Sequence, residues 1–184
     1  MRSAGFTIIE LLITVAVLAI LLYIALPNFS VWMQNTQIRT AGEAILNGVQ
    51  LARAEAIRRN ANVELRMDAS SGWTARIADT GQVIQSRVAG EGSATALVTI
   101  APAGATTVTF NSFGSIATNA DATATVTEIK IDSPSIAAAD SRELCVLVRA
   151  GGNVRLCDPQ VVATDTRTCI PPLPAPQVVP AGCT

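Results

Sequence analysis

Residues 5–27 read GFTIIELLITVAVLAILLYIALP, and this stretch sets the architecture of the chain. From Phe6 to Leu26 there are 21 residues with a single charged side chain, that of Glu10. An α-helix of this length is about 31 Å long, close to the thickness of the hydrocarbon core of a bilayer. A carboxylate in such a segment costs about 2.5–3.5 kcal/mol to insert into a membrane, so Glu10 is a candidate functional residue.

Two ordinary kinds of apolar N-terminal segment explain this stretch less well. A secretory signal peptide has a shorter apolar core that is followed by a small-residue cleavage site. Here the apolar run is long, and it ends at Pro27-Asn28-Phe29. A plain single-pass anchor, in turn, does not explain a carboxylate near one end of the apolar run.

The segment Gly5–Glu10 resembles the cleavage motif of type IV prepilins, with a Gly, a Phe, and a Glu at the fifth position after the cut. The resemblance implies a leader of residues 1–5, which a prepilin peptidase removes between Gly5 and Phe6 on the cytoplasmic side. It also implies methylation of the new Phe6 amine. The apolar segment, residues 6–27, then stays in the mature protein as a transmembrane helix that later joins the core of a filament.

This resemblance gives Glu10 a role in assembly. Before assembly, the apolar helix holds the subunit in the inner membrane with its later residues in the periplasm. During assembly, the Glu10 carboxylate meets the N-terminal ammonium of a neighbouring subunit, and this pairing offsets its desolvation in the correct register. The implied partners are other minor pilins, major pilin subunits, the prepilin peptidase and the inner-membrane assembly platform.

Residues 28–60 have the pattern of an amphipathic stem helix. Pro27 cannot donate a backbone hydrogen bond, so we expect a kink or a local loss of helix there. Apolar residues then recur at steps of three and four, as on one face of a helix: Ile38, Ala41, Ile45, Val49, Ala52 and Ala56. Asn60 is the expected stop.

From residue 61 to residue 158 the pattern changes to short β-segments with a period of two, which predicts a β-rich head. The predicted strands are Val63–Met67, Trp73–Ala78, Val83–Val88, Leu97–Ile100, Thr107–Phe110, Thr125–Ile131, Leu144–Arg149 and Asn153–Cys157. The first three are expected to form an antiparallel meander. Between residues 89 and 124 the chain is rich in Ala, Gly and Thr, which indicates surface loops between the strands.

Three segments beyond the leader are similar to the H-type pseudopilin family (GspH/FimT, FimU-like). They are Leu46–Ala56 in the stem, Asn111–Ser115, and Glu143–Asp158, which reads as a hairpin. The resemblance implies an α+β, type IV pilin-like fold, in which a long N-terminal helix packs on an antiparallel β-sheet or sandwich head.

All four cysteines lie in the last 40 residues, at Cys145, Cys157, Cys169 and Cys183. Their number and spacing favour two disulfides, and thus an oxidising compartment, over a zinc site. An Ala150–Gly152 loop places Cys145 opposite Cys157, so these two residues can pair, leaving Cys169 with Cys183. The alternative pairs Cys157 with Cys169 and Cys145 with Cys183. Four unpaired buried thiols are a further interpretation.

Residues 159–184 form a proline-rich tail, with six of the nine prolines between Pro159 and Pro180. A segment with this many prolines cannot form a regular helix or a central strand. One or two disulfides would hold it in place. It is interpreted as a clamped loop, with an exposed contact surface as the alternative.

The composition argues against an enzyme, a metal site or a cofactor. The chain has no histidine, which removes the commonest general base and metal ligand. The formal net charge is −1, so there is no overall attraction to nucleic acid.

Three functions are compatible with the motifs. The first is a minor pilin that joins a type IV pilus near its tip and helps to initiate assembly. The second is an H-type pseudopilin of type II secretion, because pilins and pseudopilins share the same leader and stem motifs. The third is a DNA-uptake minor pilin, since some FimT-like proteins bind DNA through a Gly-Arg-x-Arg motif. Here Asn153 replaces the first arginine of that motif, which leaves Arg149 and Arg155 as candidate DNA contacts.

Overall fold

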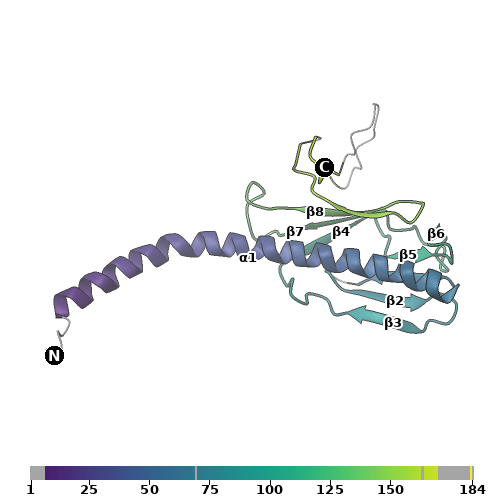
Figure 1. Cartoon of the computed structure of the whole chain (residues 1–184), viewed down its shortest axis with the longest axis horizontal. Helices are drawn as coiled ribbons and strands as arrows, with labels where there is room; N and C mark the ends of the chain where they lie inside the picture. The colour runs from purple at the N-terminus through teal and green to yellow at the C-terminus, as the bar shows by residue number, and fades with distance from the viewer. Residues whose placement is uncertain (1–6, 69, 163, 170–182, 184) are drawn as a thin grey trace. The chain divides into compact units, whose positions relative to one another are not determined.

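The computed structural model describes residues 7–68, 70–162, 164–169 and 183. It divides into two compact units, Met1–Met33 and Gln34–Thr184. Helix α1 (Ile8–Arg59) is continuous and contributes to both. Within the second unit, Figure 1 shows helix α1 packed on β-strands.

The predicted apolar stripe of the stem helix is confirmed. Its six residues, from Ile38 to Ala56, are all fully buried. The helix ends as expected at Asn60, which has a φ of 50°. The Asn60 N–H donates to Ile57 O at 3.3 Å and the Ala61 N–H donates to Ala56 O at 3.2 Å. These two bonds form a Schellman motif, which satisfies the last carbonyls of the helix.

Of the two alternatives predicted at Pro27, a kink or a local loss of helix, the second is wrong. Helix α1 continues through this position, so there is no local loss of helix. The helix extends for 26 residues, from Ile8 to Met33, in the first unit alone. A proline within a helix removes one backbone hydrogen bond and favours a kink. A bend at Pro27 stays a prediction.

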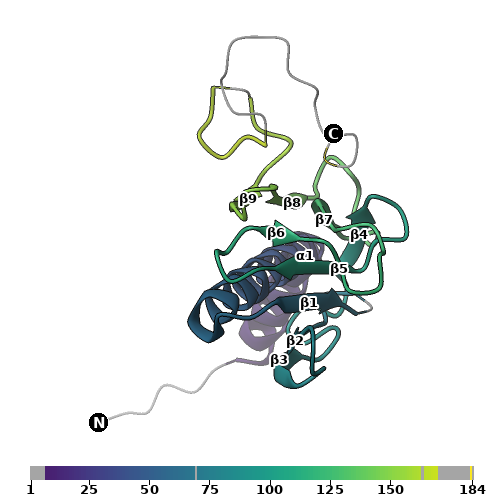
Figure 2. The same cartoon turned by 90° about the vertical axis from the view of Figure 1, so that its right-hand side faces the viewer.

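The strands form two antiparallel sheets in the second unit (Figure 2). The five-stranded sheet has the order β3-β2-β1-β5-β6 and the four-stranded sheet the order β4-β7-β8-β9. The bounds are β1 (Val63–Met67), β2 (Trp73–Ile77), β3 (Val83–Arg87), β4 (Leu97–Ala101), β5 (Thr107–Phe110), β6 (Ile116–Ala117), β7 (Glu128–Asp132), β8 (Leu144–Val148) and β9 (Val154–Cys157). The predicted meander of the first three strands is confirmed.

One hydrophobic core joins the stem helix to both sheets. Alternate residues of each strand face it, as the pleat requires. The five-stranded sheet contributes Leu65 and Phe110, and the four-stranded sheet contributes Ile131 and Val146, all fully buried. The predicted α+β arrangement, a long helix packed on antiparallel sheets, is therefore confirmed.

The segment between residues 89 and 124 is more ordered than the prediction of surface loops implied. It contains the short strand β6, which the sequence did not indicate. It is also held by the buried Asn119, whose side chain accepts a hydrogen bond from Thr109 Oγ1 at 2.9 Å and donates to Thr107 O at 3.2 Å. Nearby, Val126 N–H donates to Thr107 O, so the chain bridges to the first sheet before β7 begins at Glu128.

Candidate functional site

Helix α1 begins with a capped first turn that contains Glu10. The Glu10 N–H donates to Thr7 Oγ1 at 3.3 Å, and the Leu11 N–H donates to Thr7 O at 3.1 Å. Thr7 is thus the N-cap and Glu10 the third helical residue, the spacing of a capping box. The carboxylate lies at the positive end of the helix dipole. The Thr-x-x-Glu spacing in the sequence could have revealed this cap.

The apolar side chains that follow are exposed in the isolated chain. Those from Ile8 to Leu26 that are large and hydrophobic range from 51% to 86% exposed. The most apolar 18-residue window of α1 has a mean hydropathy of 2.8. By length and composition, α1 is able to cross a membrane. A helix that is apolar all round requires either lipid or other helices around it.

The residues predicted at the cleavage site, Gly5 and Phe6, lie outside the described part of the chain. Pro27 lies within α1. The structure therefore presents the first-turn carboxylate and the apolar helix, which are the elements of the predicted assembly site.

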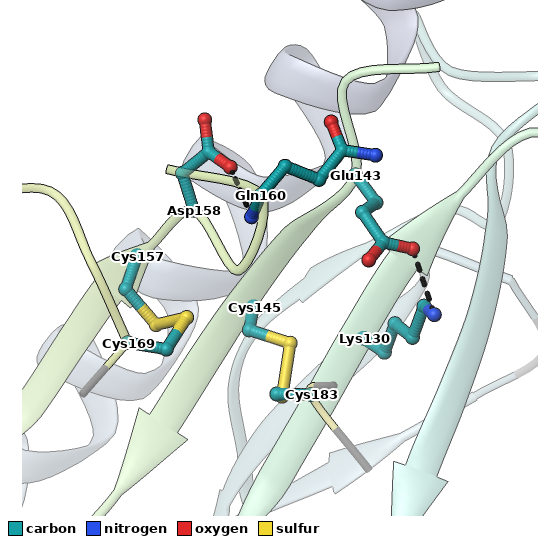
Figure 3. Close-up of a disulfide and its surroundings, with 8 residues drawn as sticks. All are labelled: Lys130, Glu143, Cys145, Cys157, Asp158, Gln160, Cys169 and Cys183. Carbon is teal, nitrogen blue, oxygen red and sulfur yellow. Dashed lines mark hydrogen bonds and ion pairs between the residues drawn. A yellow bond between two sulfur atoms is a disulfide. The ribbon is translucent and has the colours of Figure 1, made fainter. Parts of the chain in front are cut away.

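The four cysteines form two disulfides, and the register explains which pairs they make. Cys145 of β8 lies directly opposite Cys157 of β9, as the three-residue loop predicted. The two do not bond to each other, so the first predicted pairing is wrong. Cys145 pairs with Cys183 and Cys157 pairs with Cys169, which is the alternative pairing (Figure 3).

These disulfides build a second, smaller core on the outer face of the four-stranded sheet. Its members are at most 2% exposed: Cys145, Leu147, Cys157, Cys169 and Cys183. The ion pair between Lys130 Nζ and Glu143 Oε2, at 2.7 Å, lies beside it (Figure 3). Because opposite residues on paired strands share a face, Cys145 and Cys157 both point away from the main core. They can therefore hold two parts of the tail over this sheet.

The two candidate DNA contacts have different surroundings. Arg149 follows β8 and is exposed. Arg155 is half-buried, and its Nη2 donates to Thr166 O at 2.6 Å. Arg155 therefore holds the tail segment against β9, a structural task that the sequence did not indicate.

Asp158 at the end of the head and Asp165 in the tail both make local contacts. Asp158 Oδ1 accepts the Gln160 N–H at 2.9 Å. Hydrogen bonds from the Arg167 side chain and backbone lower the pKa of Asp165 to about 2. Such a carboxylate is a poor general base near neutral pH. Within the described residues there is no group of three or more His, Cys, Asp or Glu side chains that could hold a metal ion.

A junction that sequence analysis missed joins the stem helix to the tips of both sheets. Arg53 Nε donates to Gly114 O at 3.0 Å, and the Ile116 N–H donates to Ala150 O at 3.1 Å. A Cβ atom on Gly152 would lie 1.8 Å from Gly114 O, and Gly152 has a φ of 77°. Only glycine fits there. The Gly151-Gly152 pair is the signal for this close approach in the sequence, but by itself it predicts only a turn.

Two known protein families match this chain. The family described as type II transport protein GspH matches residues 41–152, and the prokaryotic N-terminal methylation motif matches residues 1–26. The chain belongs to the GspH family. The resemblance drawn from the leader, the stem and the hairpin is therefore confirmed, and the chain is a member of a family of structural pilins and pseudopilins.

One solved structure supports the same fold for this GspH-family chain. A crystal structure of the type IV minor pilin FimU from Pseudomonas aeruginosa has a TM-score of 0.52 at 15% sequence identity, and the match covers 70% of this chain and 97% of that one. A second crystal form of FimU gives 0.47 at 16% identity, covering 66% and 97% of the two chains. No curated protein matches the sequence.

Proposed function

We propose that this GspH-family protein is a minor pilin of a type IV pilus, which is incorporated near the tip and helps to initiate assembly. The observation that carries the proposal is the capped first turn of α1, which places one carboxylate, Glu10, at the start of an exposed apolar helix. Membrane anchoring and assembly with other pilin subunits follow from the family. The tip position and the initiating role are our proposal.

In this proposal the leader of residues 1–5 is removed between Gly5 and Phe6, and the Phe6 amine is methylated. The head and tail, from residue 61 onward, lie in the periplasm until the subunit enters the filament. A Glu10 carboxylate at the start of one helix meets the N-terminal ammonium of a neighbouring subunit. A buried charge pair of this kind is stabilising only when both partners are in register. The role is packing and charge pairing, not catalysis.

An H-type pseudopilin of type II secretion is the second candidate, and the description of the matched family favours it. The leader and the stem are shared by both systems. The disulfide-bonded tail favours the pilus, because disulfides persist in the oxidising environment outside the cell.

The test is an immunoblot of the sheared surface-filament fraction, with Glu10→Ala and Thr14→Ala variants. Thr14 is a matched control, because it is a polar residue in the same helix and its hydroxyl donates to Leu11 O at 2.8 Å. We expect wild type and Thr14→Ala in the filaments. Glu10→Ala should reach the membrane but not the filaments.

Two results would contradict the proposal. If Glu10→Ala enters filaments as well as wild type, the charge-pairing role is wrong. If wild type stays in the envelope of cells that make pili, and its deletion blocks export of secreted enzymes, the protein is the secretion pseudopilin instead.

A further inference from the structure

Phe113 is a large aromatic side chain that the head domain holds out into solvent. It is 86% exposed, on the loop between β5 and β6. This loop is tightly bonded: Asn111 Oδ1 accepts the N–H groups of Phe113 and Ser115, at 3.0 and 3.1 Å, and the Asn111 N–H donates to Ser115 O. A rigid loop that presents an aromatic side chain needs little ordering on binding, which is typical of an interface anchor.

The loop that carries Phe113 contacts an exposed apolar residue of the stem helix. A Cβ atom on Gly114 would lie 2.8 Å from Ile57 Cδ1, so the loop contacts Ile57 directly. Ile57 is itself 51% exposed. Beside it lies a cavity of about 340 Å³, lined by Gln50, Arg53, Ala54, Ile57 and Val154. Single exposed apolar residues are ordinary, but Ile57 both lines a cavity and contacts the loop that carries Phe113, which indicates a contact surface.

The charge in the cavity indicates the chemistry of the partner. Arg53 is half-buried, and its Nε is held by Gly114 O. Among the described residues its remaining N–H groups have no hydrogen-bond acceptor, and none of the cavity-lining residues is acidic. A half-buried guanidinium beside apolar walls fits a carboxylate.

The same charge argues against a symmetric contact with a second copy of this chain. A two-fold interface brings the same patch of both subunits together. Arg53 would then approach Arg53, and like charges at an interface oppose association.

We propose that Phe113, Ile57 and the Arg53 cavity dock an acidic, apolar-flanked segment on the head of a neighbouring pilin subunit of different sequence. This inference rests on the proposed assembly of the protein into a filament. It adds a head-to-head contact to the contact that Glu10 makes at the other end of the helix.

The test places a photo-crosslinking phenylalanine analogue at position 113 of the full-length protein, in cells that make filaments. Position 88 is the control site, because Val88 is another exposed apolar residue of the head, at 74%. We expect position 113, but not position 88, to crosslink to another protein that carries its own N-terminal methylation motif. Mass spectrometry should place the crosslink beside an Asp or Glu of its head.

Two variants test the surface itself. Arg53→Gln should lower the crosslink yield about tenfold, the factor expected for a lost charged hydrogen bond. Since Arg53 also holds the Gly114 loop, Ile57→Ser is a second variant that leaves that contact in place, and it should also lower the yield.

Three results would overturn the docking proposal while the protein is present in filaments: equal crosslinking from positions 113 and 88, crosslinks to a second copy of this chain alone, or yields that neither variant changes. If the wild-type protein is absent from filaments altogether, the proposed function fails, and the docking proposal with it.

Discussion

Gly48 of the stem helix lies directly beneath the ring of Trp73. A Cβ atom on Gly48 would lie 2.6 Å from Trp73 Cε2. The ring is 4% exposed, and its Nε1 donates to Ala44 O at 3.1 Å. The missing side chain of one residue therefore allows β2 to pack closely on α1, and the indole satisfies its donor on the helix backbone.

We expect Gly48→Ala to destabilise the head. Alanine favours a helix over glycine by about 1 kcal/mol, but overpacking a filled core costs about 1–3 kcal/mol. The net loss should be up to about 2 kcal/mol in thermal or denaturant unfolding of the full-length protein in detergent.

Gly42→Ala is the matched control, because its Cβ would meet the flexible end of Leu156 at 3.2 Å. We expect this variant to be close to neutral. Equal destabilisation by the two substitutions would contradict the contact between Gly48 and the Trp73 ring.

The disulfide pairing is testable by tryptic mapping of the unreduced protein. Cleavage at the arginines separates Cys145 and Cys157 into two peptides, while Cys169 and Cys183 stay together on the peptide 168–184. The observed pairs, Cys145–Cys183 and Cys157–Cys169, predict one species of three linked peptides. A two-peptide species with a separate, internally bonded 168–184 peptide would show the cross-strand pairing instead.

Acid should weaken the ion pairs that Glu55 makes at the end of the stem helix. Hydrogen bonds from Arg58 and Arg59, with ion-pair distances of 2.6 Å each, lower its pKa from 4.5 to about 2. Because the folded-state pKa is the lower one, the ion pairs stabilise the fold fully above about pH 4.5. Their contribution is lost as the pH falls toward about 2.

An NMR titration of the Glu55 carboxyl carbon measures this pKa. The double variant Arg58→Gln/Arg59→Gln should raise it toward the ordinary value of 4.5. A wild-type midpoint near 4.5 would show that the two ion pairs do not form in solution.

Binding of DNA by Arg149 and Arg155 should be weak or absent. Arg155 is engaged with Thr166 O, and two or three phosphate contacts give only salt-sensitive binding. In a gel shift at low salt, we expect the double variant Arg149→Ala/Arg155→Ala to behave like wild type and like the control Arg142→Ala, another exposed arginine of this region. A wild-type shift that the double variant alone abolishes would establish the DNA-uptake function.

Features that depend on neighbours in the chain were predictable. The stripe from Ile38 to Ala56 follows from the helical period, and the stop at Asn60 from its tolerance of a positive φ. The opposition of Cys145 and Cys157 follows from a loop of three residues. In each case the residues belong to one helix or one hairpin, so their spacing along the chain decides the geometry.

Features that depend on distant parts of the chain were not predictable. Asn119 becomes a buried anchor only because β5 lies beside its loop. The junction of Arg53 and Gly152 with Gly114 exists only because the stem helix and the two sheets converge at one end.

By itself, the sequence determined the apolar helix with its single carboxylate, the amphipathic stem and the β-rich head, because local periodicity and charge suffice for these elements. The tertiary structure decided which cysteines bond and where Trp73 packs. It also decided that Arg155 holds the tail while Phe113 stays exposed. Those outcomes depend on which surfaces meet when the helix and the two sheets pack around one core. The spacing of residues along the chain does not predict these contacts.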